Sequence, residues 1–564
     1  MLCSRPFLER RQGVIMRTMR WRPFSSVCWS RLFATGMLAG LTACAPTQSL
    51  SRPAPAPATK AVAVAATLKP PVAATTAPAA VPDAVANARH LLNRFAYGPR
   101  PGEAERVSRM GGERWFEAQL AGPEESPLLE VALSPHREAF VPPAQLVGDW
   151  LGDGWEAETR TLRELRQETK SRFKEHLRRL ATAELTRHIL SQRQLEAVMT
   201  DFWANHFNVY ASKGFVQLFV GDYLERALRP HALGKFSDLL LATARHPAML
   251  LYLDNADSRR ENPDDMTSGR KRRGLNENYA RELLELHTLG ADGGYSQRDV
   301  QEVARILTGW SVMQLDRGRF QYQFKRRLHD RGEKSVLGHA FPAGENEREG
   351  VRLLELLARH PATGRNLARR LCARFVADEP PASCVAAATS AYQESDGDIK
   401  QVLRAIVKDS SFWAASARGS KLKTPLELVA SAARALGAQP DGSLALAHTL
   451  EALGEPLLQE RVPTGYPDSE PEWSSGGAML ARMTFASQLG EGKLAGLRVP
   501  WDEVVGKAEG AAFVDQLGAQ LLGARPESRT LELIREQTRG IADPMQRRAA
   551  VVALLAGSPE FQRQ

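Results

Sequence analysis

Acidic and amide side chains gather in a short segment, NENYARELLELHTLGADGG, between residues 276 and 294. Asn278, Glu282 and Glu285 are spaced i, i+4 and i+7, which places them on one side of a helix. Two carboxylates one turn apart can serve as acid and base when their surroundings separate their pKa values. With an amide oxygen they can equally hold a hard cation. The competing interpretation is a solvated face, on which Arg281 pairs with its acidic neighbours.

A histidine among aromatic residues belongs to a second candidate, DFWANHFNV, at residues 201–209. Asp201 and Asn205 share a helix face at i, i+4, and His206 lies one residue further round, close to Trp203. An aromatic wall with a carboxylate and an imidazole suits a sugar ring or a peptide turn. The alternative is a core histidine whose ring nitrogens bond to the backbone.

A loop histidine followed by an aspartate gives a third candidate, in HDRGEKSVLGH from residue 329. Such a pair can orient an imidazole or join a metal shell, and local turn bonding by the aspartate is the alternative. The candidate catalytic residues are therefore Glu282, Glu285, Asp201 and His206. The candidate binding residues are Asn205, Trp203, Asn278, Arg281, His287, His329 and Asp330.

Familiar catalytic signatures are missing from the chain. It contains no His-Glu-x-x-His, no Gly-x-Ser-x-Gly and no Walker A loop. The Glu-x-x-His spacing of di-iron bundles is replaced by Glu285-Leu286-His287. No nucleotide or flavin is expected as a cofactor. A divalent metal, with His287 or His329 among its ligands, stays open.

Helical periodicity dominates the elements that must position these residues. The longest signal, at 157–208, begins with alternating charges over a thin apolar stripe, as in a solvated or bridging helix. Strand signals are confined to Trp310–Val312 and 319–324. We expect an all-α fold, either one large multi-helix domain or two helical subdomains, with at most a small β-hairpin near 310–324. Further helices are predicted at 216–228, 233–244, 276–289, 296–308, 349–358, 361–377, 384–394, 398–408, 423–436, 443–453, 476–487, 511–522, 528–538 and 543–556.

Two loops differ from the other connections. Residues 254–274 are polar and carry charges of both signs. Residues 461–473, RVPTGYPDSEPEW, hold three prolines and two aromatic residues, which predicts a rigid loop capable of covering a cleft. Both are candidate binding loops, although exposed connectors are the more common explanation.

The amino terminus has the features of an exported lipoprotein. Seven arginines precede an apolar run from Leu32 to Leu41, which is too short to span a bilayer as a mature helix. The ending Leu-Thr-Ala-Cys44 resembles a bacterial lipobox, and an ordinary signal peptide with a chance cysteine is the alternative. We expect residues 1–43 to be removed and Cys44 to carry lipid. The alanine that follows favours the outer membrane of a Gram-negative bacterium, where the lipid would hold the protein on the membrane.

Charge and composition divide the chain further. The whole chain carries +9, but residues 1–43 hold seven arginines and one glutamate, so 67 basic and 64 acidic residues remain. Net charge therefore gives no support for nucleic-acid binding. Residues 44–85 are rich in alanine and proline and predict a semi-extended tether before the helical domain at 86–564.

Cys372 and Cys384, twelve residues apart, can form a disulfide in an exported protein or stay as two buried thiols.

Several of these segments, in their order and spacing, resemble a known family, the bacterial domain of unknown function 1800. The resemblance runs from about Asn87 to the carboxyl end, through ARHLLNRFAYGPRPGE, DFWANHFNV, NENYARELLELHTLGADGGYSQRDVQEVARILTGW, HDRGEKSVLGH, HPATGRNLARRLCARFVADEPP, DGDIKQVLRAIVKDSSFW and KLKTPLELVASAARALGA. It implies a secreted or envelope-associated, largely helical protein without an agreed activity, and a secreted partner protein encoded nearby. It transfers no catalytic roles. Segment 254–274 falls where the family varies, so we do not expect the chemistry there.

Two functions fit these observations. The first is a lipid-anchored envelope protein that binds a secreted partner or assists assembly or export of a surface polymer, and the anchor, tether and large helical body favour it. The alternative is an anchored hydrolase or lyase acting on an envelope polysaccharide or peptidoglycan. Glu282 and Glu285 would then be acid and base, with Asp201 and His206 orienting the substrate. Convergence of these four side chains in one cleft would favour the enzyme, because buried carboxylates are costly unless used or paired. Their scatter over the surface would count against it.

Overall fold

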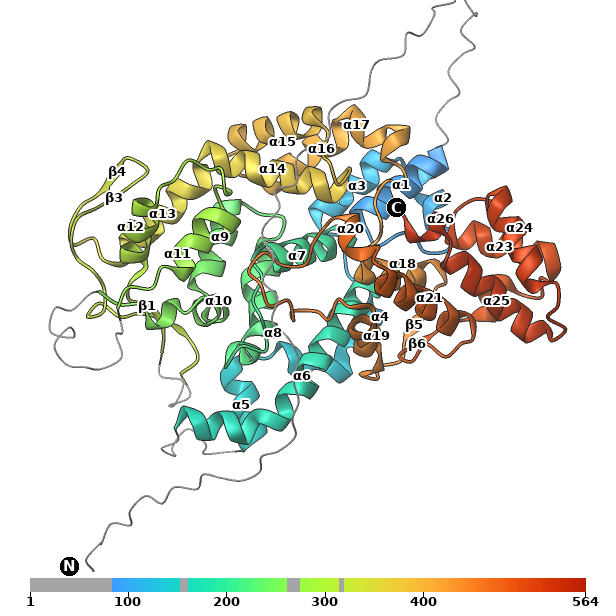
Figure 1. Ribbon diagram of the computed structural model, residues 1–564, viewed down its shortest axis with the longest axis horizontal. Coiled ribbons are helices and arrows are strands. Elements are labelled where there is room, and N and C mark those ends of the chain that lie inside the picture. Colours follow the sequence, from blue (N-terminus) through green and yellow to red (C-terminus); the bar gives the residue numbers. More distant parts are fainter. Residues whose placement is uncertain (1–83, 153–160, 261–273, 314–318) are drawn as a thin grey trace, which may run out of the picture. The chain divides into compact units, whose positions relative to one another are not determined.

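The computed structural model describes residues 84–152, 161–260, 274–313 and 319–564. These residues belong to one compact unit, and its fold is almost entirely helical (Figure 1). The expected signal segment, Cys44 and nearly all of the tether lie outside the described residues, as does 261–273 in the polar loop. Within the described ranges, none of the helices is both long and apolar enough to cross a bilayer.

The helices begin and end close to where hydrophobic periodicity and capping residues place them. Most of those predicted from residue 296 onwards lie within three residues of their observed bounds. The short helices α4, α5, α10, α20 and α22 were not predicted. The principal helices are α1 (Ala84–Phe95), α2 (Glu103–Met110), α3 (Gly112–Ala121), α4 (Pro127–Leu133), α5 (Pro143–Leu151), α6 (Leu162–Leu190), α7 (Gln194–His206), α9 (Phe236–Arg245), α10 (Pro247–Tyr252), α11 (Asn278–Glu282), α12 (Gln297–Leu307), α13 (Glu347–Arg359), α14 (Pro361–Phe375), α15 (Ala382–Glu394), α16 (Ile399–Lys408), α18 (Pro425–Ala435), α19 (Ala445–Leu453), α20 (Glu470–Trp473), α21 (Gly476–Gly490), α22 (Trp501–Val505), α23 (Gly510–Leu521), α24 (Ser528–Thr538) and α25 (Pro544–Ala556).

Residues 157–160 of the long helical signal at 157–208 lie outside the described residues, and the rest of the signal contains two helices, α6 and α7. Thr161 and Glu164 form a capping box that starts α6. The chain then breaks between α6 and α7, where the carboxylate of Glu125 accepts hydrogen bonds from the Ser191 hydroxyl at 2.5 Å and from the Arg193 amide at 3.0 Å. A distant acid therefore satisfies amides that a continuous helix would have used internally.

Sheet structure is limited to short antiparallel pairs. The expected hairpin joins β1 (Trp310–Val312) to β2 (Tyr322–Phe324), with Ser311 opposite Gln323. The described residues also contain two pairs beyond the single hairpin expected from the sequence. They join β3 (Lys334–Val336) to β4 (His339–Phe341) and β5 (Gln439–Pro440) to β6 (Leu497–Arg498). Segments of two or three residues are too short to show an alternating pattern, which is why the sequence did not reveal them.

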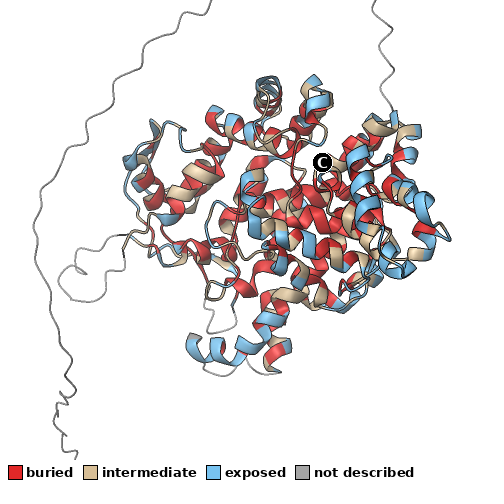
Figure 2. Cartoon of the chain, turned by 45° about the vertical axis from the view of Figure 1, so that its right-hand side comes forward, coloured by how far each residue is buried: buried red, intermediate tan, exposed pale blue. Residues whose placement is uncertain are grey.

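Helix α18 forms the centre of the core. All of its residues are buried, and it packs against α6. The buried faces of the surrounding helices meet inside, while their exposed faces point outwards (Figure 2). Residues 562–564 pair with 421–423, just before this helix begins: the Lys423 amide donates to the Gln562 carbonyl at 2.9 Å, and the Gln564 amide donates to the Lys421 carbonyl at 2.9 Å. The last described residues are thus joined to the start of the central helix.

Candidate functional site

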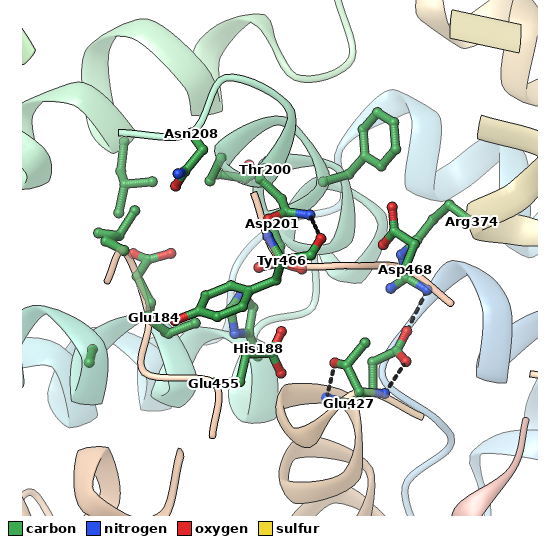
Figure 3. A pocket seen from close by; sticks show the side chains of 18 of the residues that line it. Glu184, His188, Thr200, Asp201, Asn208, Arg374, Glu427, Glu455, Tyr466 and Asp468 are labelled. Carbon is green, nitrogen blue, oxygen red and sulfur yellow. Dashed lines mark hydrogen bonds and ion pairs between the residues drawn. The ribbon is translucent and has the colours of Figure 1, made fainter. Parts of the chain in front are cut away.

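A cavity lies where α6, α7, α14 and α18 meet the segment between α19 and α20 (Figure 3). We call residues 456–469 of that segment the strap. The cavity has a volume of about 60 Å³, which is room for a few waters. Its polar lining residues are Glu184, His188, Thr200, Asp201, Asn205, Asn208, Arg374, Thr424, Glu427, Glu455, Tyr466 and Asp468.

The Asp201 carboxyl group has an unusually high pKa. It projects from the last two turns of α7 and is half-buried. Burial raises its pKa to about 7, and the charges of Glu427 and Asp468 add to the shift, while Arg374 opposes it. Because burial disfavours the charged form of a carboxyl group, this group exchanges its proton near neutral pH.

The Glu455 carboxyl group is the second acid with a raised pKa. It follows the helix-ending Gly454, is 7% exposed, and accepts a 2.7 Å hydrogen bond from the backbone amide of Leu426 at the start of α18. A helix amino terminus normally lowers the pKa of a carboxyl group. Here burial dominates, and with the charge of Asp201 it raises the pKa of Glu455 to about 8. At neutral pH this carboxyl group is protonated.

A buried ion pair supplies fixed charges to the same cavity. Arg374, on α14, pairs with Glu427, which also completes the capping box of α18 with Thr424. Burial alone would raise the pKa of Glu427, but the Arg374 guanidinium and the Thr424 amide hold it below its usual range. Both partners therefore stay charged, unlike the two carboxyl groups with raised pKa values.

A neutral imidazole lies on the α6 side of the cavity. His188 is 3% exposed, and burial lowers its pKa to about 4. Its Nδ1 atom has no hydrogen-bond partner among the described residues, and its ring lies 4.6 Å from that of Tyr97. One turn earlier, Glu184 is held ionised by Arg229, with contacts of 2.8 and 2.9 Å. The imidazole is thus an uncharged group with one free ring nitrogen beside an acidic cavity.

The strap covers this cavity and is fastened by two side-chain amides, Asn205 on α7 and Asn208 just after its end. Asn205 accepts a 2.6 Å hydrogen bond from the Tyr466 amide and donates a 2.8 Å bond to the Tyr466 carbonyl. Asn208 donates to the carbonyls of Glu460 and Val462 at 3.1 and 2.8 Å. Segment 461–473, described from the sequence as a rigid loop capable of covering a cleft, contributes Tyr466, Pro467 and Asp468 to the lining of this cavity.

The two histidines proposed beside this site lie outside it. His206 and His287 are both 1% exposed, and His206 Nε2 lies 3.1 Å from the His287 carbonyl oxygen. Burial lowers the pKa of His287 to about 3 and that of His206 well below its usual range. They pack in an aromatic cluster with Trp203, whose indole nitrogen donates to the Ala232 carbonyl at 2.9 Å. These side chains are part of the core, and the described cavity does not include them.

The acidic helix face at Glu282 and Glu285 does not line the cavity either. Both side chains are half-buried, and burial together with the neighbouring Glu285 raises the pKa of Glu282. Arg281 lies 3.4 Å from Glu277, as the surface-pair interpretation expects, and Asn278 donates to the Leu253 carbonyl at 3.3 Å. The four proposed catalytic side chains thus do not meet in this cavity. Asp201 lines it and the other three do not, so the convergence that would favour this set of catalytic residues is not observed.

The backbone explains why the spacing around Glu285 misled. Leu283–His287 forms a π turn, in which the Thr288 hydroxyl donates to the Leu283 carbonyl at 2.6 Å. Hydrogen bonds in a π turn reach one residue further than in an α-helix. The i, i+4, i+7 relationship therefore does not hold through this segment.

The loop residues His329 and Asp330 contact different partners, so they do not act as a pair. His329 is fully buried, with Nδ1 2.8 Å from the Thr308 carbonyl oxygen, whereas Asp330 forms an ion pair with Arg305 at 2.9 Å. In the described ranges, no three or more His, Cys, Asp or Glu side chains come together as a group that could hold a metal ion. Elsewhere, Cys372 and Cys384 form a disulfide between α14 and α15.

Most of the cavity's charged residues escaped the sequence analysis because they are far apart in the chain. Glu427 was readable only as a capping acid in Thr424-Pro-Leu-Glu427, and nothing local ties it to Arg374. Glu455 had a weak signal, since it is an isolated acid in the apolar run ALGEPLL. A lone charge in an apolar run is costly unless it is paired or used.

Comparison with known proteins places the chain in a family without describing its chemistry. A family model described as a protein of unknown function, DUF1800, matches residues 90–563. No curated protein and no solved structure matches the chain.

Proposed function

The chain belongs to the DUF1800 family of proteins of unknown function, and we propose that it is an acid–base enzyme, a hydrolase or lyase that acts on a polymer of the cell envelope. One observation carries the proposal. Two carboxyl groups, Asp201 and Glu455, line one cavity with pKa values of about 7 and 8. Groups poised near the working pH are what general acid–base catalysis requires.

The two groups take different roles at neutral pH. Glu455, with the higher pKa, is protonated and serves as the general acid for a leaving group. Asp201 is partly ionised and serves as the general base, towards water in a hydrolase or towards a substrate C–H in a lyase. Arg374 remains charged by its pairing with Glu427 and stabilises negative charge nearby.

Substrate access requires the strap to move. The cavity has room for a few water molecules, whereas a sugar or peptide unit needs several hundred Å³. Leu458, in the strap, has φ of +59° although it is not glycine, which marks local backbone strain. The hydrogen bonds from Asn205 and Asn208 would break and re-form as the strap opens and closes.

The location is part of the same proposal. The arginine-rich start, the apolar run and the Leu-Thr-Ala-Cys44 ending support export and lipid attachment, with the outer membrane as the destination. An anchor followed by a tether would hold the helical body close to peptidoglycan and envelope polysaccharides.

The test compares single isosteric variants of the cavity acids. The helical body, from residue 84 onwards, is incubated with peptidoglycan and purified envelope polysaccharides, and the products are identified by mass spectrometry. Cleavage by the unmodified protein that is lost in Glu455→Gln and Asp201→Asn supports the proposal. The matched control is Glu282→Gln with Glu285→Gln, which removes two half-buried acids outside the cavity. Loss of cleavage in that control alone would move the site to α11.

Binding of a secreted partner, or assistance in assembly or export of a surface polymer, is the second candidate. The observation that favours it is the exposure of large apolar side chains on neighbouring helices, with Leu480 on α21 at 69% and Met545 on α25 at 76%. Such surfaces mark protein interaction sites when they form a contiguous patch. Crosslinking in cells distinguishes the candidates, because a partner lost in Leu480→Glu but retained in Glu455→Gln would support the binding role.

A further inference from the structure

Helix α6 carries four basic side chains at regular four-residue spacing, Arg166, Lys170, Lys174 and Arg178. This spacing places them along one face over about 18 Å. Like charges four residues apart destabilise a helix, so binding of an external anion along this row would relieve their repulsion. Arg178 pairs with Glu451 at 3.3 Å, whereas no described acidic side chain forms an ion pair with the other three.

This basic row borders a groove much larger than the acidic cavity. The groove has a volume of about 660 Å³. Phe173 and Leu177 contribute apolar surface to it, and Arg461 from the strap lies with its guanidinium 5.9 Å from the centre of the Tyr210 ring. Among the described lining residues Glu451 is the single acid, and it is already paired. The groove therefore combines unpaired positive charge with aromatic surface.

The groove and the cavity share a wall. Ala181 of α6 and Leu457 of the strap line both spaces. These two residues therefore belong to the wall between the groove and the cavity, and the strap forms part of both boundaries. Movement of the strap would join the two spaces.

We propose that this groove binds an anionic polysaccharide, with carboxylate or phosphate substituents along its chain, and presents it to the acidic cavity. The inference rests on the proposed function for its catalytic part, while binding stands on the groove alone. Unpaired cations spaced along a helix match charges repeated along a polymer. The half-buried Tyr210, which lines the groove beside Arg461, offers an aromatic side chain to a sugar, and a carboxyl pair suits cleavage of a glycosidic chain.

The test measures binding by the full chain in detergent to polygalacturonic acid, with its methyl-esterified form as the neutral counterpart. We expect binding to the acidic form, weakened by salt, and weakened about tenfold in Lys170→Gln with Lys174→Gln. The matched control is Arg535→Gln on α24 with Arg539→Gln just after its end, which removes the same charge outside the groove and should leave binding unchanged. Asp201→Asn and Glu455→Gln should also bind as the unmodified protein does.

The outcomes separate this inference from the proposed function. Equal binding of the acidic and neutral polymers would contradict the proposal that the groove binds an anionic polymer. An equal loss of binding affinity in the double lysine variant and in the double arginine control would contradict it as well. Stronger binding of single-stranded DNA than of polygalacturonate would contradict a polysaccharide ligand and would indicate that the groove binds nucleic acid. Cleavage that survives Lys170→Gln with Lys174→Gln leaves the proposed function standing without the groove, whereas binding without cleavage of any envelope polymer leaves the groove without the enzyme.

Discussion

At the scale of single residues, the cavity contains two kinds of ionisable group: an ion pair that keeps its charges at neutral pH, and two carboxyl groups whose protonation changes near neutral pH. Glu427 and Arg374 hold each other charged, whereas Asp201 and Glu455 have pKa values near neutral pH because burial disfavours their ionised forms. Only the second kind can give up and accept protons during a reaction. The sequence identified Asp201 from its aromatic neighbours, but it could not identify Glu455, whose environment is made by α18 and α7.

The pH dependence of cleavage follows from these two groups. If Asp201 acts ionised and Glu455 acts protonated, kcat/KM should rise with an apparent pKa near 7 and fall with one near 8. The two limbs belong to the interacting pair, so they give a narrow optimum between those values. Rates measured from pH 5 to 10 check this. Asp201→Glu, which keeps a carboxyl group, should shift the acidic limb, and an unmoved profile in that variant would contradict the assignment.

The same pKa values predict how stability changes with pH. Because folding raises both pKa values, the folded state binds more protons than the unfolded state between about pH 4 and 8, and stability falls as pH rises through that window. Glu455→Gln should therefore raise the free energy of unfolding at pH 8.5 by about 1–3 kcal/mol and change it little at pH 4. Urea titrations at both values measure the difference. A variant equally destabilised at both values would show that the carboxyl group has a structural role only.

At the scale of elements, the strap couples the cavity to the groove through a few backbone contacts. Gly465 has φ of +75°, and a Cβ atom there would lie 2.4 Å from both the backbone oxygen and Oδ1 of Asn205. The close approach lets Asn205 hold Tyr466 by two hydrogen bonds. Sequence reasoning recognised this segment as a covering loop from its prolines and aromatics, but the fastening by α7 depends on residues some 260 positions away.

Replacement of this glycine should release the strap. Gly465→Ala combines a disfavoured backbone angle with a clash, so we expect faster limited proteolysis within 456–469 and loss of cleavage or altered KM. Gly492→Ala is the matched control, because it has φ of +67° but open space around the added atom. If both variants are cut at the same rate in the strap, backbone strain rather than contact with Asn205 explains the effect.

The disulfide acts on the pairing of α14 with α15. A bridge across twelve residues restricts the unfolded chain, so Cys372→Ala with Cys384→Ala should lower the free energy of unfolding by about 3 kcal/mol. Urea unfolding of the oxidised protein and the variant measures this. Reductant should lower the midpoint for the unmodified protein and leave the variant unchanged. Equal midpoints for the unmodified protein with and without reductant would show that the bridge is not formed in solution.

At the scale of the whole molecule, local patterns determined far more of the fold than of the site. Apolar periodicity and caps such as Thr424 placed most helices, because those signals act within one or two turns. The break between α6 and α7 was missed, because Glu125 comes from another part of the chain. The cavity was missed for the same reason, since its charged residues come from positions between 184 and 468.

Because residues 562–564 pair with 421–423, next to Glu427, we expect the structure of the cavity to depend on residues 562–564. Deletion of residues 562–564 removes the hydrogen bonds at Lys421 and Lys423 and the contact of Gln564 with Glu427. We expect the shortened protein to unfold at lower urea concentration and to lose cleavage. Circular dichroism and the product assay measure the two effects. Deletion of a purification tag attached after residue 564 serves as the control, and full activity of the shortened protein would contradict this dependence.

This pairing also has a consequence for biosynthesis. The ribosome adds residues 562–564 after every other described part of the chain, and the start of α18 obtains its final partners only then. A chain interrupted during translation or translocation would therefore lack the contact that completes the surroundings of Glu427. If the cavity is the proposed acid–base site, its chemistry would begin only in molecules that already contain residues 562–564.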